Sequence, residues 1–231
     1  MCGRFTLTTT NDEMRERFGV VITQNLKPSW NIAPSNQSVI LHSDGLENKA
    51  FQAEFGFTSS QPSKRIINAR SESLTEKPTF SPLVHQNRCL VIASGWYEWS
   101  ADKTPYHVQL NDGRVMAMAG LFRPANAQQK SQFVIITTQA DQALKSIHHR
   151  CPAILPMASW QDWLSGDAGR ALGHINVPSA KYFNWYQVRK DVGKVGNDHA
   201  GLVEPLQNMA SSDSPPEQIS TVHGQSDLFT D

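Results

Sequence analysis

The chain has 231 residues, of which 39% are hydrophobic, and it carries 21 basic and 21 acidic side chains. This length supports one globular domain with a sizeable core, and the neutral balance gives no indication of a polyanionic partner. Three cysteines without regular spacing exclude a disulfide framework and a cysteine-based metal site. No apolar run approaches the roughly 20 residues of a membrane span and no signal peptide is recognisable, so we expect a cytoplasmic protein.

Short strands dominate the chain, and their spacing favours hairpins over crossover units. In chain order, the segments expected as strands are residues 2–7, 38–42, 50–57, 89–93, 106–110, 115–121, 133–138, 152–156 and 185–188. The segments expected as helices are residues 10–18, which begin with a capping box, residues 141–147 and residues 158–164. Turn residues at 43–45 and 111–114 each predict a hairpin. The pattern indicates an α+β fold, with a mostly antiparallel sheet or open barrel and peripheral helices.

Two stretches lack a regular pattern. Residues 30–34 are expected to form a loop, because Pro34 biases the residue before it away from helix. From about residue 207 the chain becomes polar and proline-rich. We therefore expect one catalytic domain over residues 1–206 and a disordered polar tail over residues 207–231.

Cys2 follows Met1 directly and is the first candidate for a reactive group. Removal of Met1 would leave an α-amine with a pKa near ~7.7–8.0 and a thiol with a pKa near ~8.5 on one residue. An aldehyde would condense with the amine to an imine, and the thiol would then close a five-membered thiazolidine ring. Because this second step is intramolecular, it gains from effective molarity. The alternative is that the Met-Cys pair occurs here by chance.

Three further segments carry side chains suited to chemistry. Glu98 follows an apolar strand among tryptophans, where partial desolvation suits general acid/base work, although an exposed strand position is equally compatible. Asn68 and Arg70 would share one face of a strand and suit a carbonyl and a phosphate, although such pairs are more often plain surface residues. His148 suits an acid or base, and because consecutive residues rarely share one ion, we expect no metal in the segment 148–151.

Five segments, in order along the chain, resemble the SRAP family, the SOS response-associated peptidases or abasic-site processing proteins. They are Met1-Cys2-Gly3-Arg4-Phe5, Trp30-Asn31-Ile32-Ala33-Pro34, Asn68-Ala69-Arg70-Ser71-Glu72, Gly95-Trp96-Tyr97-Glu98-Trp99, and Thr137-Thr138 leading to Ile147-His148 and Arg150. The resemblance implies a monomer without cofactor that binds abasic sites in single-stranded DNA near the nucleoid or replication fork. It also implies removal of Met1 by the protein itself and a covalent thiazolidine cross-link through Cys2.

The resemblance further implies roles for individual residues. Cys2 would be the nucleophile, Asn68 would position the amine and the sugar, and Glu98 would shuttle protons. His148 would assist opening of the sugar ring and reversal of the cross-link. The residues that it places along the DNA are Arg4, Arg70, Asn31, Pro34 and Thr137.

Two stretches depart from the family pattern. The family has Trp-Gly before a base-wedging loop with a second Trp, whereas this chain has Phe55-Gly56-Phe57 followed by polar residues up to Pro62. His149 and Cys151 stand where the family commonly has an acidic or amide residue and a methionine. We therefore expect the chemistry to be retained and DNA binding to be weaker.

Two other classes of protein remain compatible with parts of the pattern. An N-terminal-nucleophile amidohydrolase also begins Met-Cys-Gly, but it would attack an amide carbonyl and release ammonia from glutamine. A non-catalytic single-stranded DNA binding module would bind in a salt-sensitive way without needing Cys2.

Overall fold

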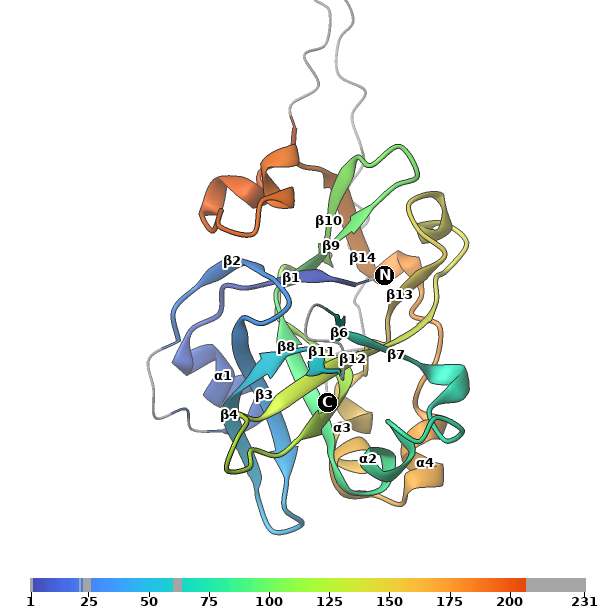
Figure 1. Ribbon diagram of the computed structural model, residues 1–231. Coiled ribbons are helices and arrows are strands. Elements are labelled where there is room, and N and C mark those ends of the chain that lie inside the picture. The colour runs from blue at the N-terminus through green and yellow to red at the C-terminus, as the bar shows by residue number, and fades with distance from the viewer. Residues whose placement is uncertain (1, 21, 23–25, 60–63, 207–231) are drawn as a thin grey trace, which may run out of the picture.

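Strand β1, which follows Cys2, lies inside a five-stranded sheet (Figure 1). The computed structural model describes residues 2–20, 22, 26–59 and 64–206, so the expected tail at 207–231 lies outside the described residues. The strands of this first sheet are β1 (Arg4–Leu7), β2 (Ser29–Ile32), β9 (Gly95–Trp99), β10 (Pro105–Leu110) and β14 (Phe183–Gln187). Their order is β14-β10-β9-β1-β2 and all pairs are antiparallel.

The second sheet closes on itself. Its strands are β3 (Gln37–Ser43), β4 (Asn48–Phe55), β7 (Asn68–Arg70), β8 (Arg88–Ala93), β11 (Met116–Arg123), β12 (Gln132–Gln139) and β13 (Arg150–Pro152). The order runs β11-β8-β3-β4-β12, and because β11 also pairs with β12, these five strands form a closed barrel. The far end of β12 pairs with β7 on one edge and with β13 on the other. The expected α+β fold with mostly antiparallel sheets is confirmed, with a closed barrel in place of an open one.

The helices are short and lie around the barrel (Figure 1). The α-helices are α1 (Asn11–Phe18), α2 (Ser81–Gln86), α3 (Trp160–Ser165) and α4 (Ala168–Gly173), and a two-stranded ribbon is formed by β5 (Phe57–Thr58) and β6 (Arg65–Ile66). The 3-10 turns are η1 (Ser71–Ser73), η2 (Leu144–Ser146), η3 (Met157–Ser159), η4 (Ala180–Tyr182), η5 (Lys190–Gly193) and η6 (Ala200–Val203). Helix α1 begins as expected, because the Thr10 side chain accepts a hydrogen bond from the Glu13 N–H at 3.1 Å.

The hairpin expected around residues 43–45 is confirmed as the antiparallel pair β3–β4. The hairpin expected around residues 111–114 is wrong, because β10 belongs to the first sheet and β11 to the barrel. The turn residues there do reverse the chain, but local sequence does not encode which strand becomes the neighbour. Residues 30–32 are strand, not loop, and the helix expected over 141–147 shrinks to the single turn η2.

An aromatic cluster fastens β1 to the barrel. The Phe5 ring lies edge-on to Phe55 of β4, with centroids 5.5 Å apart, and 6.3 Å from Phe133 of β12. Phe55 and Phe133 stack on each other at 5.2 Å, and all three side chains are fully buried. Each such pair contributes about 0.5–1.5 kcal/mol beyond its buried area. Strand β1, which begins two residues after Cys2, is therefore packed against β4 and β12 of the barrel.

Gly95 begins β9 at a place where a side chain has no room. A Cβ atom there would lie 2.4 Å from His107 Nε2 and 2.7 Å from the Val108 carbonyl oxygen. His107 is itself buried, and burial lowers its pKa to about 4, so the ring is neutral at neutral pH. The glycine permits β9 and β10 to approach closely at a point three residues before Glu98.

We expect Gly95→Ala to destabilise the protein by about 1–3 kcal/mol, because the added methyl group overpacks the contact with His107. Thermal unfolding followed by circular dichroism measures the loss. Gly196→Ala is the matched control, because a Cβ there meets nothing within 4 Å. Equal melting temperatures for the two variants would contradict the close approach.

Candidate functional site

Cys2 is anchored to the barrel through its main chain. The Asn68 side-chain amide donates to the Cys2 carbonyl oxygen at 3.0 Å, and more weakly to the Ile135 carbonyl at 3.4 Å. Asn68 stands at the start of β7, in register with Ile135 of β12. Its own Oδ1 atom is buried and has no hydrogen-bond partner among the described residues. An acceptor is thus held ready beside Cys2.

Glu98 lies close to the same cysteine. The register of β1 and β9 pairs Arg4 with Tyr97, so Glu98 comes beside Gly3, the neighbour of Cys2. Glu98 is 5% exposed, so the exposed alternative considered from sequence is wrong. Burial, and then the negative charge of Glu98, raise the pKa of the Cys2 thiol well above its usual range. The thiol is therefore protonated at neutral pH and needs a base before it can react.

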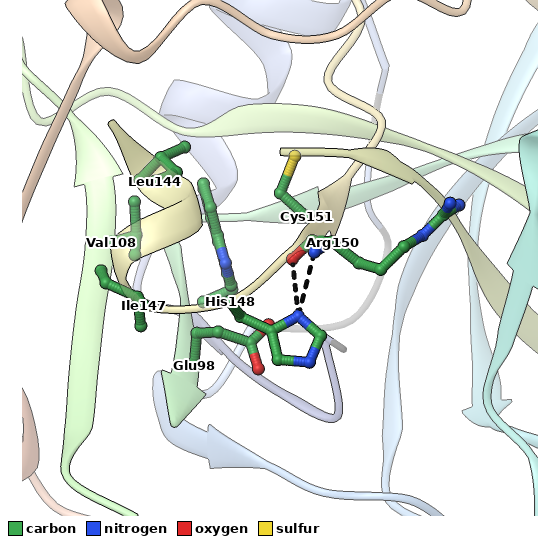
Figure 2. Close-up of a pocket in the computed structure, with 8 residues that line it drawn as sticks. Glu98, Val108, Leu144, Ile147, His148, Arg150 and Cys151 are labelled. Atoms are coloured by element: carbon green, nitrogen blue, oxygen red, sulfur yellow. Dashed lines mark hydrogen bonds between the residues drawn. The ribbon is translucent and has the colours of Figure 1, made fainter. Parts of the chain in front are cut away.

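A small pocket joins Glu98 to His148 (Figure 2). Its volume is about 10 Å³, enough for roughly one water molecule. Besides these two residues, the lining consists of Trp96, Val108, Leu144, Ile147, Arg150 and Cys151. Figure 2 shows the His148 ring next to the Glu98 carboxyl group, with the side chains coming from β9 and from the segment after η2. Two groups that can exchange protons thus line one small, partly open pocket.

The orientation of His148 is set by hydrogen bonds to its own segment. The Arg150 N–H donates to His148 Nδ1 at 3.0 Å, and the Arg150 carbonyl oxygen lies 3.2 Å from the same nitrogen. The shorter contact, from the Arg150 N–H, needs a lone pair on Nδ1 and favours the tautomer with the proton on Nε2, whereas the carbonyl contact would need the proton on Nδ1. The His148 residue is half-buried.

His149 and Cys151, the two residues after His148 that depart from the family pattern, lie in different environments. His149 is exposed and stacks on the His148 ring with centroids 4.3 Å apart. The charge of His148 is the first cause that lowers the pKa of His149. Cys151 is buried in β13, where its thiol donates to the Gln139 carbonyl at 3.5 Å and burial raises its pKa to about 12. Cys151 is therefore a poor nucleophile.

Arg4 and Asn31 bind other parts of the protein. The Arg4 guanidinium donates to Asn31 Oδ1 at 2.8 Å and to the Val192 carbonyl at 2.8 Å, and also reaches the Gly193 carbonyl at 3.3 Å. The Asn31 amide donates to the carbonyl oxygens of Val192, Lys194 and Asn197 at 3.2, 3.2 and 2.7 Å. These two side chains fasten the segment 192–197 onto β1 and β2. Their contact with DNA stays a prediction.

The remaining residues expected along the DNA, Arg70, Pro34 and Thr137, differ in burial. Arg70 is exposed at the end of β7, and its alternation with Asn68 puts both on one strand face. Pro34 is half-buried after β2. Thr137 is fully buried in β12, with its hydroxyl 3.5 Å from the Ala69 carbonyl. Only Arg70 among these offers an exposed charge.

Phe55 and Phe57 do not replace the missing wedge tryptophans. Both side chains are fully buried. Phe57 contacts Phe80 at 6.4 Å and is covered by the Arg123 guanidinium 4.3 Å from its ring centre. These rings stabilise the barrel, and residues 60–63 of the altered loop lie outside the described residues.

Sequence reasoning assigned no role to Glu72 and Arg150, although both stand in the recognised segments. The Arg150 guanidinium forms a two-pronged ion pair with Glu72, at 2.7 and 3.0 Å, and Arg150 is buried. The available signal was their position, since Glu72 lies two residues after Arg70 and Arg150 two residues after His148. Their mutual contact could not be read from that spacing.

Comparison with known proteins agrees with this geometry. The family profile of SOS response associated peptidase (SRAP) matches residues 1–195, and the chain belongs to this family. "Abasic site processing protein YoqW" of Bacillus subtilis is 31% identical over 222 residues, covering 88% of this chain and 99% of the relative. "Abasic site processing protein YedK" of Escherichia coli is 28% identical over 226 residues, covering 89% and 100%.

A crystal structure of a protein from Bacteroides thetaiotaomicron shares the fold, with a TM-score of 0.76. It is 20% identical and the match covers 89% of this chain and all of that one. Within the described residues, every helix is too short or too polar to cross a membrane.

We expect Asn31→Ala to lower stability by about 2 kcal/mol, or roughly 4–8 °C in Tm, because three carbonyl oxygens each lose one donor and the Arg4 guanidinium loses an acceptor. Thermal unfolding without DNA measures this effect. Asn176→Ala is the control, because that exposed amide makes one long bond of 3.3 Å to the His174 carbonyl. A Tm unchanged by Asn31→Ala would show that Asn31 does not hold the segment 192–197.

Proposed function

We propose that this protein processes abasic sites in single-stranded DNA, by forming a covalent thiazolidine with the open-ring aldehyde through Cys2 after it has removed Met1. The names of the curated relatives support the abasic-site role. The observation that carries the chemistry is the hydrogen bond of 3.0 Å from Asn68 to the Cys2 main chain, with Glu98 buried alongside.

Hydrolysis of the Met1–Cys2 peptide bond would create the α-amine on which the reaction depends. The unpartnered Asn68 Oδ1 is a suitable acceptor for that amine, because Asn68 already holds the Cys2 carbonyl. A neutral amine attacks the aldehyde carbon and loses water to give an imine. Placing amine and carbonyl carbon by hydrogen bonds converts an encounter into a step within one complex.

Ring closure needs the thiol proton to leave. The pKa of the Cys2 thiol is raised, so spontaneous ionisation at neutral pH is rare. Glu98 is the nearby carboxylate that accepts this proton as sulfur adds to the imine carbon, and the nitrogen is protonated in turn. The products are one C–S bond and a secondary amine in the ring. Because the thiol stays protonated until Glu98 removes the proton, it reacts only when the imine of a bound aldehyde is in place.

His148 is placed to exchange a proton with the sugar. Its Nδ1 accepts from the Arg150 N–H, which leaves Nε2 to carry the proton of the neutral ring. Opening of the closed sugar ring requires a proton at the ring oxygen, and reversal of the cross-link requires one at the departing group. A histidine sharing the pocket with Glu98 suits both steps.

The net charge of residues 1–206, counted without residues 207–231, is positive and suits the binding of a nucleic-acid strand. Residues 1–206 hold all 21 basic side chains, whereas four of the 21 acidic ones lie in residues 207–231. The domain therefore has an excess of positive charge that the whole-chain balance concealed. Arg70, exposed next to Asn68, is the cation best placed to meet a phosphate beside the lesion.

We expect the wild-type protein to gain the mass of a single-stranded abasic oligonucleotide, less one water, and to lack the mass of Met1. Cys2→Ala would abolish the adduct because it removes the ring-closing thiol. Intact-mass spectrometry after incubation measures both changes.

Cys89→Ala serves as control, because Cys89 is a buried thiol of β8 outside the pocket. A Cys2→Ala protein that still cross-links would overturn the proposal. Ammonia release from glutamine without any adduct would instead establish the amidohydrolase reading.

A further inference from the structure

The Glu72–Arg150 ion pair joins the two segments that carry Asn68 and His148. Glu72 lies in η1, directly after β7, and Arg150 begins β13. Arg150 Nη1 and Nη2 bind the two Glu72 carboxylate oxygens at 2.7 and 3.0 Å, and Nη2 also donates to the Thr137 carbonyl and hydroxyl oxygens. One buried guanidinium therefore ties η1, β12 and β13 together.

The same residue sets the His148 ring through its main chain. The Arg150 N–H reaches His148 Nδ1 at 3.0 Å (Figure 2). The position of that N–H depends on where β13 lies, and β13 is held by three Cα pairs with β12 and by the Arg150 side chain. A shift of β13 would weaken the bond to Nδ1 and free the ring to carry its proton on either nitrogen.

We propose that Glu72 is a positioning residue, which acts through Arg150 to hold His148 as the Nε2–H tautomer and at a fixed distance from Asn68. The part of this inference that concerns reaction rate rests on the proposed function, whereas the tautomer does not. The two-pronged geometry matters because a planar guanidinium fixes direction as well as distance. Small displacements between reacting groups are costly, so a partly exposed glutamate outside the pocket lining would control the rate.

The test compares Glu72→Gln with wild type by two-bond ¹H–¹⁵N correlation of the imidazole rings, with His148 assigned from the resonances lost in His148→Gln. Wild type is expected to show a single Nε2–H tautomer for His148, and Glu72→Gln a mixture. The rate of adduct formation with an abasic oligonucleotide is expected to fall about tenfold in Glu72→Gln.

Glu76→Gln is the matched control, because Glu76 is an exposed glutamate four residues further on. Glu72→Asp retains the charge and should restore the tautomer in part, which separates positioning from simple misfolding. A Glu72→Gln protein with an unchanged tautomer and rate would overturn the inference. Failure of wild type to form any adduct would refute the proposed function and leave the tautomer measurement valid.

Discussion

The hydrogen bond from Asn68 to the Cys2 carbonyl is the contact on which the arrangement of the site depends. Cys2 lies two residues before β1 of the five-stranded sheet, whereas Asn68 begins the short strand β7 attached to the barrel. The bond therefore joins the two sheets at the point where the proposed chemistry takes place. A single hydrogen bond is too weak to fix the distance between them. The burial of Phe5 against Phe55 and Phe133 supplies the additional stabilisation.

The barrel and the five-stranded sheet contribute different residues to the candidate site. The sheet brings Glu98 beside Cys2 through the register of β1 and β9. The barrel strand β12 carries Asn68 on one edge, through β7, and the His148 segment on the other, through β13. The four residues expected to perform catalysis thus come from four separate segments. Their spacing depends on strand pairing, which is stiff, more than on loops.

Three arginines near the site have different roles. The Arg4 guanidinium donates to an amide and to carbonyl oxygens inside the protein, and the Arg150 guanidinium to a carboxylate and a carbonyl oxygen, whereas Arg70 is exposed. Burial of a guanidinium is costly unless most of its donors are satisfied. Both Nη atoms of the buried Arg150 are bonded, whereas its Nε has no partner among the described residues, and the part-buried Arg4 bonds through both of its Nη atoms. The electrostatic attraction of DNA is therefore left to exposed cations of residues 1–206, which hold all 21 basic side chains and all but four of the 21 acidic ones.

The sequence by itself determined the elements whose causes are local, and the residue types at the site. The Thr10 cap, the β3–β4 hairpin and the buried run of β8 follow from hydrogen bonding and hydrophobicity within a few residues. The five recognised segments indicated Cys2, Asn68, Glu98 and His148 together. Only the tertiary structure decided that β10 and β11 separate into different sheets, that Glu98 is buried, and that Arg4 and Asn31 bind the segment 192–197. The physical reason is that these outcomes depend on which distant strand supplies the partner, and a chain's local pattern carries no record of that choice.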